Sequence, residues 1–315
     1  MGRRLVSTKD MSREDWLELR RKSLGGSDAA AVLGESPWKS PLTLYAEKKG
    51  LIDDKVTSEA MRQGTDLEAY VANRFMEATG KKVRRSNFMY MHDYHDFITA
   101  NIDRDVVDEN AGLECKVMNV YSDAKLRREG HHLIPEQYYY QCQHYMMVMG
   151  YDHMYLAVLV PPFDFWWEKI DRNDDAIESL LHREIEFWIN HIEQSQPPEA
   201  DGSESSLSTL AWLHPQDNGE EVWIDTDMEI QRYQELTQTI NRMEKQKDEL
   251  RARICSDIGD ASFGRSDKYV VSWKAQEKAG IDSKYLRENY PEVYEECKTH
   301  ISFRVMRIKE IKEDK

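Results

Sequence analysis

Two neighbouring stretches decide the fold, Phe97-Ile-Thr-Ala-Asn-Ile-Asp103 and Gly112-Leu-Glu-Cys-Lys-Val117. Each is short, mainly apolar and bounded by polar turns, so each predicts a strand. A third strand is expected at Val83–Met91, and the short connections favour an antiparallel meander. Glu114 and Lys116 lie two residues apart, so their side chains point to the same face of the sheet. If the two quoted strands pair, Asp103 comes close to Glu114.

Helical patterns lie on both sides of this meander. Before it, Ser12 and Asp15 form a capping box, Pro41 opens a second helix, and a third is expected over Thr57–Thr79. After it, the pattern predicts a helix over 135–150, strands over 153–160 and 165–170, and a helix over 174–194. The sequence therefore predicts an α/β (α+β) fold, in which helices flank a mixed sheet that contains an antiparallel meander.

The chain has 315 residues, enough for a core and an appendage, because domains average ~150 residues. We predict a core over 1–196, a proline- and serine-rich linker over 197–221, and an appendage over 222–315. The appendage contains a long charged helix over 225–258, followed by paired strands near 269–274 and 302–308. The long helix could hold a partner or another subunit, or pack back on its own core, and the sequence leaves these alternatives open.

The net charge of −15 by itself disfavours nucleic acid as a partner. Its distribution weakens that objection, because residues 171–235 hold 17 acids and 3 bases and the remaining 250 residues carry a net charge of −1. Basic clusters lie at 20–22, 81–85 and 125–128. A DNA surface needs such local positive potential rather than a basic total, although a single charge run is usually a solvated face.

Several classes of protein are excluded by composition. No segment approaches the ~18 consecutive apolar residues of a membrane helix, and the first residues lack the apolar run of a secretory signal. The four cysteines are far apart and form no C-x-x-C pair, so neither a disulfide scaffold nor a zinc knuckle is indicated. We therefore expect a cytoplasmic protein with reduced thiols and no membrane contact.

Two candidate metal-site residues lie in the meander. Asp103 and Glu114 would place two carboxylates beside the ammonium group of Lys116, and such hard oxygen ligands suit Mg²⁺, which keeps water and substrate phosphate in its shell. Glu68 adds a third carboxylate on the apolar stripe of its helix, where it needs a partner. The alternative is a structural ion pair, in which Glu68 or Asp103 is buried against Lys116.

Three further side chains suit a phosphate. Arg20 offers a guanidinium, Ser27 offers a hydroxyl beside a Gly-Gly turn at a helix start, and Gln141 aims an amide where apolar groups would pack. Each also has a structural interpretation: a solvated charge for Arg20, an N-cap for Ser27, and a hydrogen bond to core backbone for Gln141.

Short motifs occur in a fixed order over most of residues 12–170. They are Trp16-Leu-Glu-Leu-Arg20, Gly25-Gly-Ser27-Asp28-Ala-Ala-Ala-Val-Leu-Gly34, Ser36-Pro-Trp-Lys-Ser-Pro41, Gly64-Thr-Asp-Leu-Glu68, Asp103, Glu114-Cys-Lys116 and Tyr140-Gln-Cys-Gln-His-Tyr-Met146. In combination they resemble the YqaJ-like viral recombinases, phage alkaline exonucleases of the lambda-exonuclease type within the PD-(D/E)xK nuclease superfamily.

The resemblance implies a restriction-endonuclease-like core and a role for each site residue. It implies metal-site carboxylates at Glu68, Asp103 and Glu114, and a catalytic lysine at Lys116. It implies a pocket for a DNA 5′-phosphate, formed by Arg20, Ser27 and Gln141. Asn101 stands two residues before Asp103, where relatives often place a small hydroxyl residue, and the resemblance makes it a fourth candidate for contact with the 5′-phosphate or the DNA.

The implied activity is that of a Mg²⁺-dependent 5′→3′ exonuclease on linear double-stranded DNA, with Mn²⁺ as a substitute metal and 5′-phosphomononucleotides as products. Lambda-type relatives assemble as ring trimers and pass the 3′ single-stranded tail to a phage single-strand annealing protein of the RecT or Bet type. One alternative is a structure-specific or single-strand nuclease of the same superfamily. The other is a non-catalytic scaffold that binds DNA ends.

Overall fold

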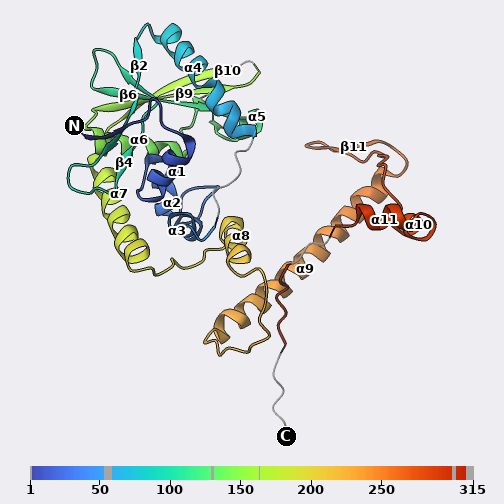
Figure 1. Ribbon diagram of the computed structural model, residues 1–315. Helices are drawn as coiled ribbons and strands as arrows, with labels where there is room; N and C mark the ends of the chain where they lie inside the picture. Colours follow the sequence, from blue (N-terminus) through green and yellow to red (C-terminus); the bar gives the residue numbers. More distant parts are fainter. Residues whose placement is uncertain (1, 53–58, 129–130, 163, 300–302, 310–315) are drawn as a thin grey trace. The chain divides into compact units, whose positions relative to one another are not determined.

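The computed structural model describes residues 2–52, 59–128, 131–162, 164–299 and 303–309. The chain divides into two compact units, Met1–His214 and Pro215–Lys315 (Figure 1). Within the described ranges, no helix combines the length and the apolar composition that a membrane span requires.

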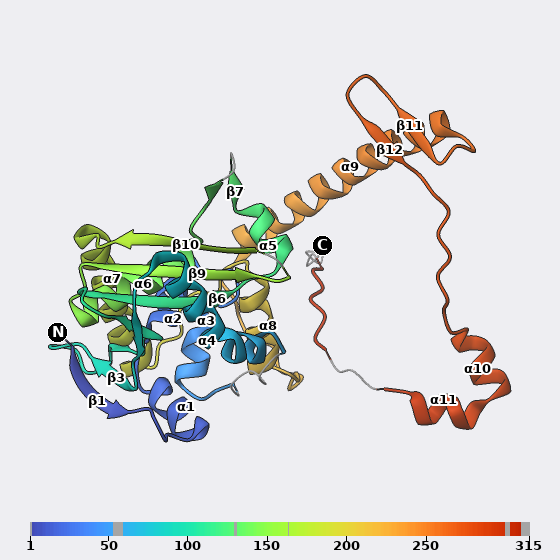
Figure 2. The same ribbon diagram turned by 90° about the horizontal axis from the view of Figure 1, so that it is seen from above.

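A five-stranded mixed sheet forms the centre of the first unit (Figures 1 and 2). Its strands, in spatial order, are β10 (Asp164–Asp171), β9 (His153–Val160), β6 (Ala111–Val117), β5 (Arg104–Val106) and β2 (Val83–Arg85). Neighbouring strands are antiparallel except β6 and β9, which run parallel. A parallel pair needs a crossover connection, and α6 (Glu136–Met149) lies in this one.

Helices cover both faces of this sheet. α4 (Glu59–Thr79) packs its apolar stripe against Leu113 and Cys115 of β6. α6 and α7 (Asp174–Phe187) cover the opposite face. Because side chains alternate along a strand, Glu114 and Lys116 lie on the face opposite Leu113 and Cys115, toward α6.

The N-terminal segment adds three helices and a second sheet. The helices are α1 (Arg13–Arg21), α2 (Gly26–Leu33) and α3 (Pro41–Lys48), and the sheet has the order β1 (Arg3–Ser7), β3 (Phe88–Met91), β4 (Thr99–Ala100). Two helix starts form as predicted: the hydroxyl of Ser12 accepts from the Asp15 N–H at 3.1 Å, and that of Ser40 accepts from the Thr43 N–H at 3.1 Å.

Smaller elements complete both units. In the first unit these are α5 (Val120–Lys125), β7 (Arg127–Arg128), β8 (His131–His132), a π-helical turn η1 (Trp188–Glu193) and α8 (Glu204–Leu213). In the second unit they are α9 (Asp227–Ile258), β11 (Phe263–Arg265), β12 (Val270–Ser272), α10 (Ser283–Asn289) and α11 (Pro291–Cys297).

The predicted mixed sheet with its antiparallel meander and flanking helices is confirmed, but two of the predicted strands are divided. The stretch 83–91 forms β2 and β3, which belong to different sheets, and 97–103 contributes only β4 before the chain turns into β5. The second division arises because the segment at Ile98 bridges to Leu24 of the N-terminal segment. Asp103 consequently lies between strands and is not a strand partner of Glu114.

Three other expectations need correction. The predicted linker at 197–221 contains α8, which is held to α3 by hydrogen bonds between the Thr43 hydroxyl and the hydroxyls of Ser205 and Thr209, both at 2.7 Å. The strand expected at 269–274 pairs with β11 in a hairpin. The described part of 302–308 forms no strand, and residue 302 lies outside the described residues. The helix expected over 174–194 changes to a π-turn at Trp188.

Candidate active site

Glu114 is the buried centre of the site. Its side chain is 3% exposed, and its Oε1 accepts from Lys116 Nζ at 2.6 Å and from Gln141 Nε2 at 2.7 Å. Its other oxygen, Oε2, is buried and has no hydrogen-bond partner among the described residues. An unpartnered buried carboxylate oxygen is costly, so this atom marks a place where a cation or a polar ligand would be stabilised.

Asp103 lies beside Glu114, although it reaches that position from a turn. Its Oδ2 accepts from the backbone N–H of Cys115 at 2.8 Å. Burial, together with the nearby carboxylates of Glu114 and Glu68, raises the pKa of Asp103 well above its ordinary value. Three carboxylates therefore share one low-dielectric region, and the nearby positive charge does not fully offset their mutual repulsion.

Lys116 supplies the cation closest to this group. Its Nζ also lies 5.2 Å from the ring centre of Tyr138, in cation–π geometry. Burial alone would lower its pKa, but the carboxylates of Glu114 and Asp103 outweigh that effect and raise the pKa of Lys116. The lysine therefore stays protonated at neutral pH, as a donor and a positive charge rather than a base.

Glu68 is paired with a cation that the sequence prediction missed. Its Oε1 accepts a short hydrogen bond from Arg104, so the expected alternative, an ion pair with Lys116, is wrong for Glu68. Arg104 is 7% exposed and also donates to the backbone carbonyl of Asp103 at 2.7 Å. A buried arginine directly after Asp103 was the available signal, since a charge on an inner strand needs a partner.

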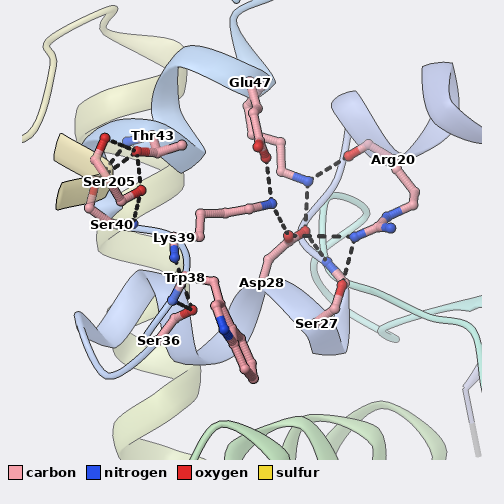
Figure 3. A network of polar contacts seen from close by, with 12 residues as sticks. Arg20, Ser27, Asp28, Ser36, Trp38, Lys39, Ser40, Thr43, Glu47 and Ser205 are labelled. Carbon is pink, nitrogen blue, oxygen red and sulfur yellow. Dashed lines mark hydrogen bonds and ion pairs between the residues drawn. The ribbon is translucent and has the colours of Figure 1, made fainter. Parts of the chain in front are cut away.

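A second network surrounds Asp28, which the prediction did not single out (Figure 3). Asp28 is 1% exposed, and its carboxylate lies 2.7 Å from Lys48 Nζ, 3.6 Å from Lys39 Nζ and 3.6 Å from Arg20 Nη2. Burial would raise the pKa of Asp28, but these three cations hold it well below its ordinary value. It also accepts from the Gly25 N–H at 3.2 Å, as the third residue of α2.

This Asp28 network orients Arg20 and Ser27. Arg20 Nη2 donates to the Ser27 hydroxyl at 2.6 Å, and the Arg20 carbonyl accepts from Lys48 Nζ at 2.6 Å. Ser27 is exposed in the first turn of α2, whose N-cap is Gly25, so the N-cap interpretation of Ser27 is wrong. A guanidinium and a hydroxyl meet at a helix N-terminus, which is a favourable place for an anion.

A cavity of about 620 Å³ joins the two networks. Its lining includes Arg20, Asp28, Lys39, Lys48, Glu68, Asp103, Glu114 and Lys116. Ser27 is not part of this lining, but it is hydrogen-bonded to Arg20, which is. Gln141 stands behind Glu114 and also donates to the Tyr145 hydroxyl at 3.0 Å, so its amide bonds to side chains rather than to core backbone. Asn101 is half-buried and is not part of this lining.

The carboxylates fit a hard divalent cation, although they are not preassembled as a full ligand set. In the described part of the chain, no three carboxylate, imidazole or thiol side chains form a ready-made metal site. The reason is visible, because Glu68 and Glu114 each hold a cationic side chain. Asp103 and the free Oε2 of Glu114 remain as two adjoining oxygen ligands, the number by which Mg²⁺ is commonly held.

Comparison with known proteins places this chain in a family. The YqaJ-like viral recombinase domain matches residues 15–152. Protein YqaJ of Bacillus subtilis (strain 168) is 37% identical over 314 residues, covering 98% of this chain and 97% of the relative. Protein D345L of African swine fever virus is 39% identical over 66 residues, 21% of this chain and 19% of its own.

Solved structures with a similar arrangement are more distant in sequence. The alkaline exonuclease of Laribacter hongkongensis is 20% identical with a TM-score of 0.49, covering 57% of this chain and 93% of its own. A phage-related exonuclease from Haemophilus somnus is 12% identical with a TM-score of 0.41, covering 55% and 96%. On the near full-length identity to the Bacillus protein, the chain belongs to the YqaJ-like viral recombinase family.

Proposed function

We propose that this chain is a Mg²⁺-dependent 5′→3′ exonuclease on linear double-stranded DNA that leaves 3′ single-stranded tails for recombination by strand annealing. Mn²⁺ is the expected substitute metal. The recombinase family supports a role in DNA recombination. The polarity and the product are what the family resemblance implies, and the metal is inferred from the carboxylates of the site as well.

One observation carries the proposal. Asp103 and Glu114 lie side by side in a buried region, Glu114 Oε2 lacks a partner among the described residues, and Lys116 is next to both. Oδ1 of Asp28 and Oε2 of Glu184 also lack a hydrogen-bond partner among the described residues, but Asp28 Oδ1 lies 3.6 Å from two cations and Glu184 is paired with His144, whereas Glu114 lies beside two further carboxylates. This arrangement suits a site that is completed by a cation and a phosphate.

The side chains of the site have different roles in the proposed reaction. Gln141 and Lys116 hold Glu114 in one orientation through Oε1, which keeps Oε2 directed toward the ligand. Lys116, being protonated, would stabilise the charge that develops on the phosphate oxygens. A divalent ion held by Asp103 and Glu114 would supply Lewis-acid chemistry and lower the pKa of bound water.

The second network supports an end-specific reaction. Arg20 and Ser27 meet at the N-terminus of α2, and Lys39 and Lys48 add positive charge to the same cavity. Charged donors at a helix N-terminus bind a terminal phosphate, which carries more negative charge than an internal one. We propose that this pocket holds the DNA 5′-phosphate and that the neighbouring carboxylates cut next to it.

Assembly and partners follow from the same proposal. The family resemblance favours a ring trimer around double-stranded DNA ends and transfer of the 3′ tail to a phage single-strand annealing protein. Both are proposals that need direct measurement.

A non-catalytic scaffold that binds DNA ends is the second candidate. One observation favours it, since Glu68 pairs with Arg104 and Glu114 with Lys116, so that two of the three carboxylates are already neutralised. In that case the cavity would bind a DNA end without hydrolysis.

Digestion of a linear duplex decides between the two. One strand is labelled at its 5′ end and, in a parallel reaction, at its 3′ end, with Mg²⁺, with Mn²⁺ or with a chelator. We expect rapid release of the 5′ label as mononucleotide, retention of the 3′ label in long strands, and no release with the chelator. A retarded duplex with no release in either metal would contradict the exonuclease and support the scaffold.

A further inference from the structure

α9 exposes a seam of apolar side chains along one face. They recur at alternating spacings of three and four residues, as Tyr233, Leu236, Ile240, Met243, Leu250 and Ile254. Lys247 occupies the one polar position in the series, and it is exposed as well. A seam that repeats every ~3.5 residues is typical of a helix that pairs with another helix, whereas a helix that covers a globular core shows a wider stripe.

A basic groove lies at the C-terminal end of this seam. It measures about 580 Å³ between α9 and β12, and its apolar wall includes Leu250, Ile254 and Trp273. Lys247 and Arg251 are its charged members, and no acidic residue is found among the described residues that line it. The groove therefore suits an apolar segment that carries negative charge.

This chain contains such a segment immediately before α9. Val222, Trp223 and Ile224 follow Glu220 and Glu221 and precede Asp225. The segment has no regular secondary structure, and Trp223 is 95% exposed. A tryptophan so exposed, between carboxylates, is an unused hydrophobic anchor.

The segment cannot reach the groove of its own molecule. Ile224 precedes the first residue of α9 by only three residues, and even Val222 extends no more than ~17 Å beyond that point. Leu250 lies 23 residues along the same rigid helix, a distance of ~34 Å. Only a second molecule can bring the segment and the groove together.

We propose that two copies of this chain associate through antiparallel α9 helices, with the acidic segment of each copy at the groove of the other. In the register that we infer, Tyr233 faces Met243 and Leu236 faces Ile240 of the second copy. Glu229 of each copy then faces Lys247 of the other, so the one polar seam position gains an opposite charge. The same register brings Asp225 of each copy next to Arg253 of the other. It also places the acidic segment of each copy level with the groove of the other.

Other registers of the same helices create conflicts. A parallel pair in register would set Lys247 against Lys247. An antiparallel pair shifted by one heptad toward the C-terminus would place Arg232 against Arg253 and leave the segment beyond the groove. Because like charges at such positions are destabilising, charge complementarity selects the register described above. This contact involves only the second unit and is independent of the proposed nuclease activity.

Charge reversal in the full-length chain tests the contact. We expect Lys247→Glu to raise the dissociation constant of self-association at least ~tenfold, measured as molar mass by light scattering over a concentration series without DNA. Adding Glu229→Lys to the same chain should restore association. Lys245→Glu, with the same charge change on the outer face of α9, is the matched control and should have little effect. Equal molar masses for the parent and Lys247→Glu would overturn the proposal, as would loss of association without rescue.

Disulfide trapping tests the register. In a Cys255→Ser, Cys297→Ser background, Thr237→Cys lies next to its own counterpart across the two-fold axis, so we expect a covalent dimer on mild oxidation. Leu250→Cys should form none, because its counterpart lies at the other end of the pair. A strong dimer from Leu250→Cys would show a parallel pair, and an equal yield from the outward-facing Gln238→Cys would show random collision. Either result would overturn the proposal.

Discussion

Asp28 is buried and Asp103 is half-buried in the lining of one cavity, yet the charges that surround them have opposite sign. Asp28 is surrounded by Lys48, Lys39 and Arg20, which hold its pKa far below the ordinary value in spite of burial. Asp103 is half-buried beside Glu114 and Glu68, and its desolvation together with these two carboxylates raises its pKa. The first carboxylate is neutralised by the protein itself, and the second is left with an excess of negative charge.

This difference separates a structural site from a ligand site. A buried charge with counter-charges around it stabilises one arrangement of the chain. Its removal destabilises the fold, because the partner charges stay buried without a counter-charge. In a buried cluster of like charges the repulsion is unrelieved, so the cluster favours binding of a cation. The comparison leads to five predictions, from the largest expected effect to the smallest.

Replacement of the lysine at the uncompensated site should abolish chemistry. We expect Lys116→Ala to lower turnover by ~10³-fold or more, because the charged donor beside Glu114 and Asp103 is lost, while DNA binding persists. Rates of nucleotide release and duplex retardation measure the two properties. Lys22→Ala is the matched control, since Lys22 pairs with Glu18 on the exposed face of α1. Unchanged turnover in Lys116→Ala would remove the role assigned to the lysine.

Replacement of Asp28, the aspartate that three cations surround, should lower the stability of the fold. We expect Asp28→Asn to lower the free energy of unfolding by about 3–5 kcal/mol, because Lys48 is then buried beside two other cations without a counter-charge. Denaturant titration at pH 7 measures it. Asp15→Asn at an exposed helix start is the control, with a loss of about 1 kcal/mol at most. A stability equal to the parent would show that the network is not structural.

Removal of the guanidinium that links the two networks should change substrate preference. We expect Arg20→Ala to reduce the preference for 5′-phosphorylated over 5′-hydroxyl ends by ~tenfold, the effect of one charged hydrogen bond. Initial rates on the two duplexes measure the ratio. Equal rates on both ends with the parent protein would contradict the phosphate pocket itself.

Neutralising the uncompensated aspartate should stabilise the metal-free chain. We expect Asp103→Asn to raise the Tm by a few degrees in chelator, on the order of a 1 kcal/mol gain, because like-charge repulsion is relieved while an amide oxygen can still accept from Cys115. In Mg²⁺ the parent should gain Tm by binding the ion and the variant should not. A lower Tm for the variant in chelator would show that Asp103 is already compensated.

Another buried carboxylate, Glu184, extends the comparison to the pH dependence of stability. It lies 2.7 Å from His144 Nδ1, and His144 Nε2 lies 2.8 Å from the carbonyl oxygen of Thr99. Burial would lower the pKa of His144, but Glu184 outweighs it and raises the pKa. The imidazolium form therefore stabilises the fold fully below the unfolded pKa of ~6.5, and this contribution is lost as pH rises through the higher folded pKa.

We therefore expect the stability of the parent to decline above neutral pH more steeply than that of His144→Gln. Denaturant midpoints between pH 6 and 9 measure this slope. The exposed His182, which lies 3.5 Å from Glu186, is the control, and His182→Gln should leave the slope unchanged. Parallel slopes for the parent and His144→Gln would show that the imidazole does not change its charge in this range.

Much of the site could be predicted because it depends on strand periodicity. Glu114 and Lys116 share a face of β6 by alternation alone, and that face turns toward α6, where Gln141 is found. The expectation for Gln141 was partly right, since its amide is buried in the core, but its partner is a carboxylate. Asn101 was suggested by its position along the chain, and neither Asn101 nor Gln141 is part of the cavity lining.

The missed residues depend on contacts between distant segments. Lys48 is 20 positions from Asp28, and Arg104 is 36 positions from Glu68. A lysine or an arginine in a sequence is usually a solvated charge, and no local pattern marked Lys48 as buried. The position of Arg104 on an inner strand indicated that it needs a partner, but not that the partner is Glu68. The division of the stretch 97–103 has the same origin, because the pairing of Ile98 with Leu24 competes with the continuous strand that local pattern favours.

The sequence by itself determined the mixed sheet, the order of its helices and the strand that presents Glu114 and Lys116, because these follow from spacings of two and of three to four residues. Only the tertiary structure decided which carboxylates are neutralised and which are not. That distinction depends on the distance of each buried charge from its counter-charges in a low-dielectric interior, and local sequence spacing does not encode it.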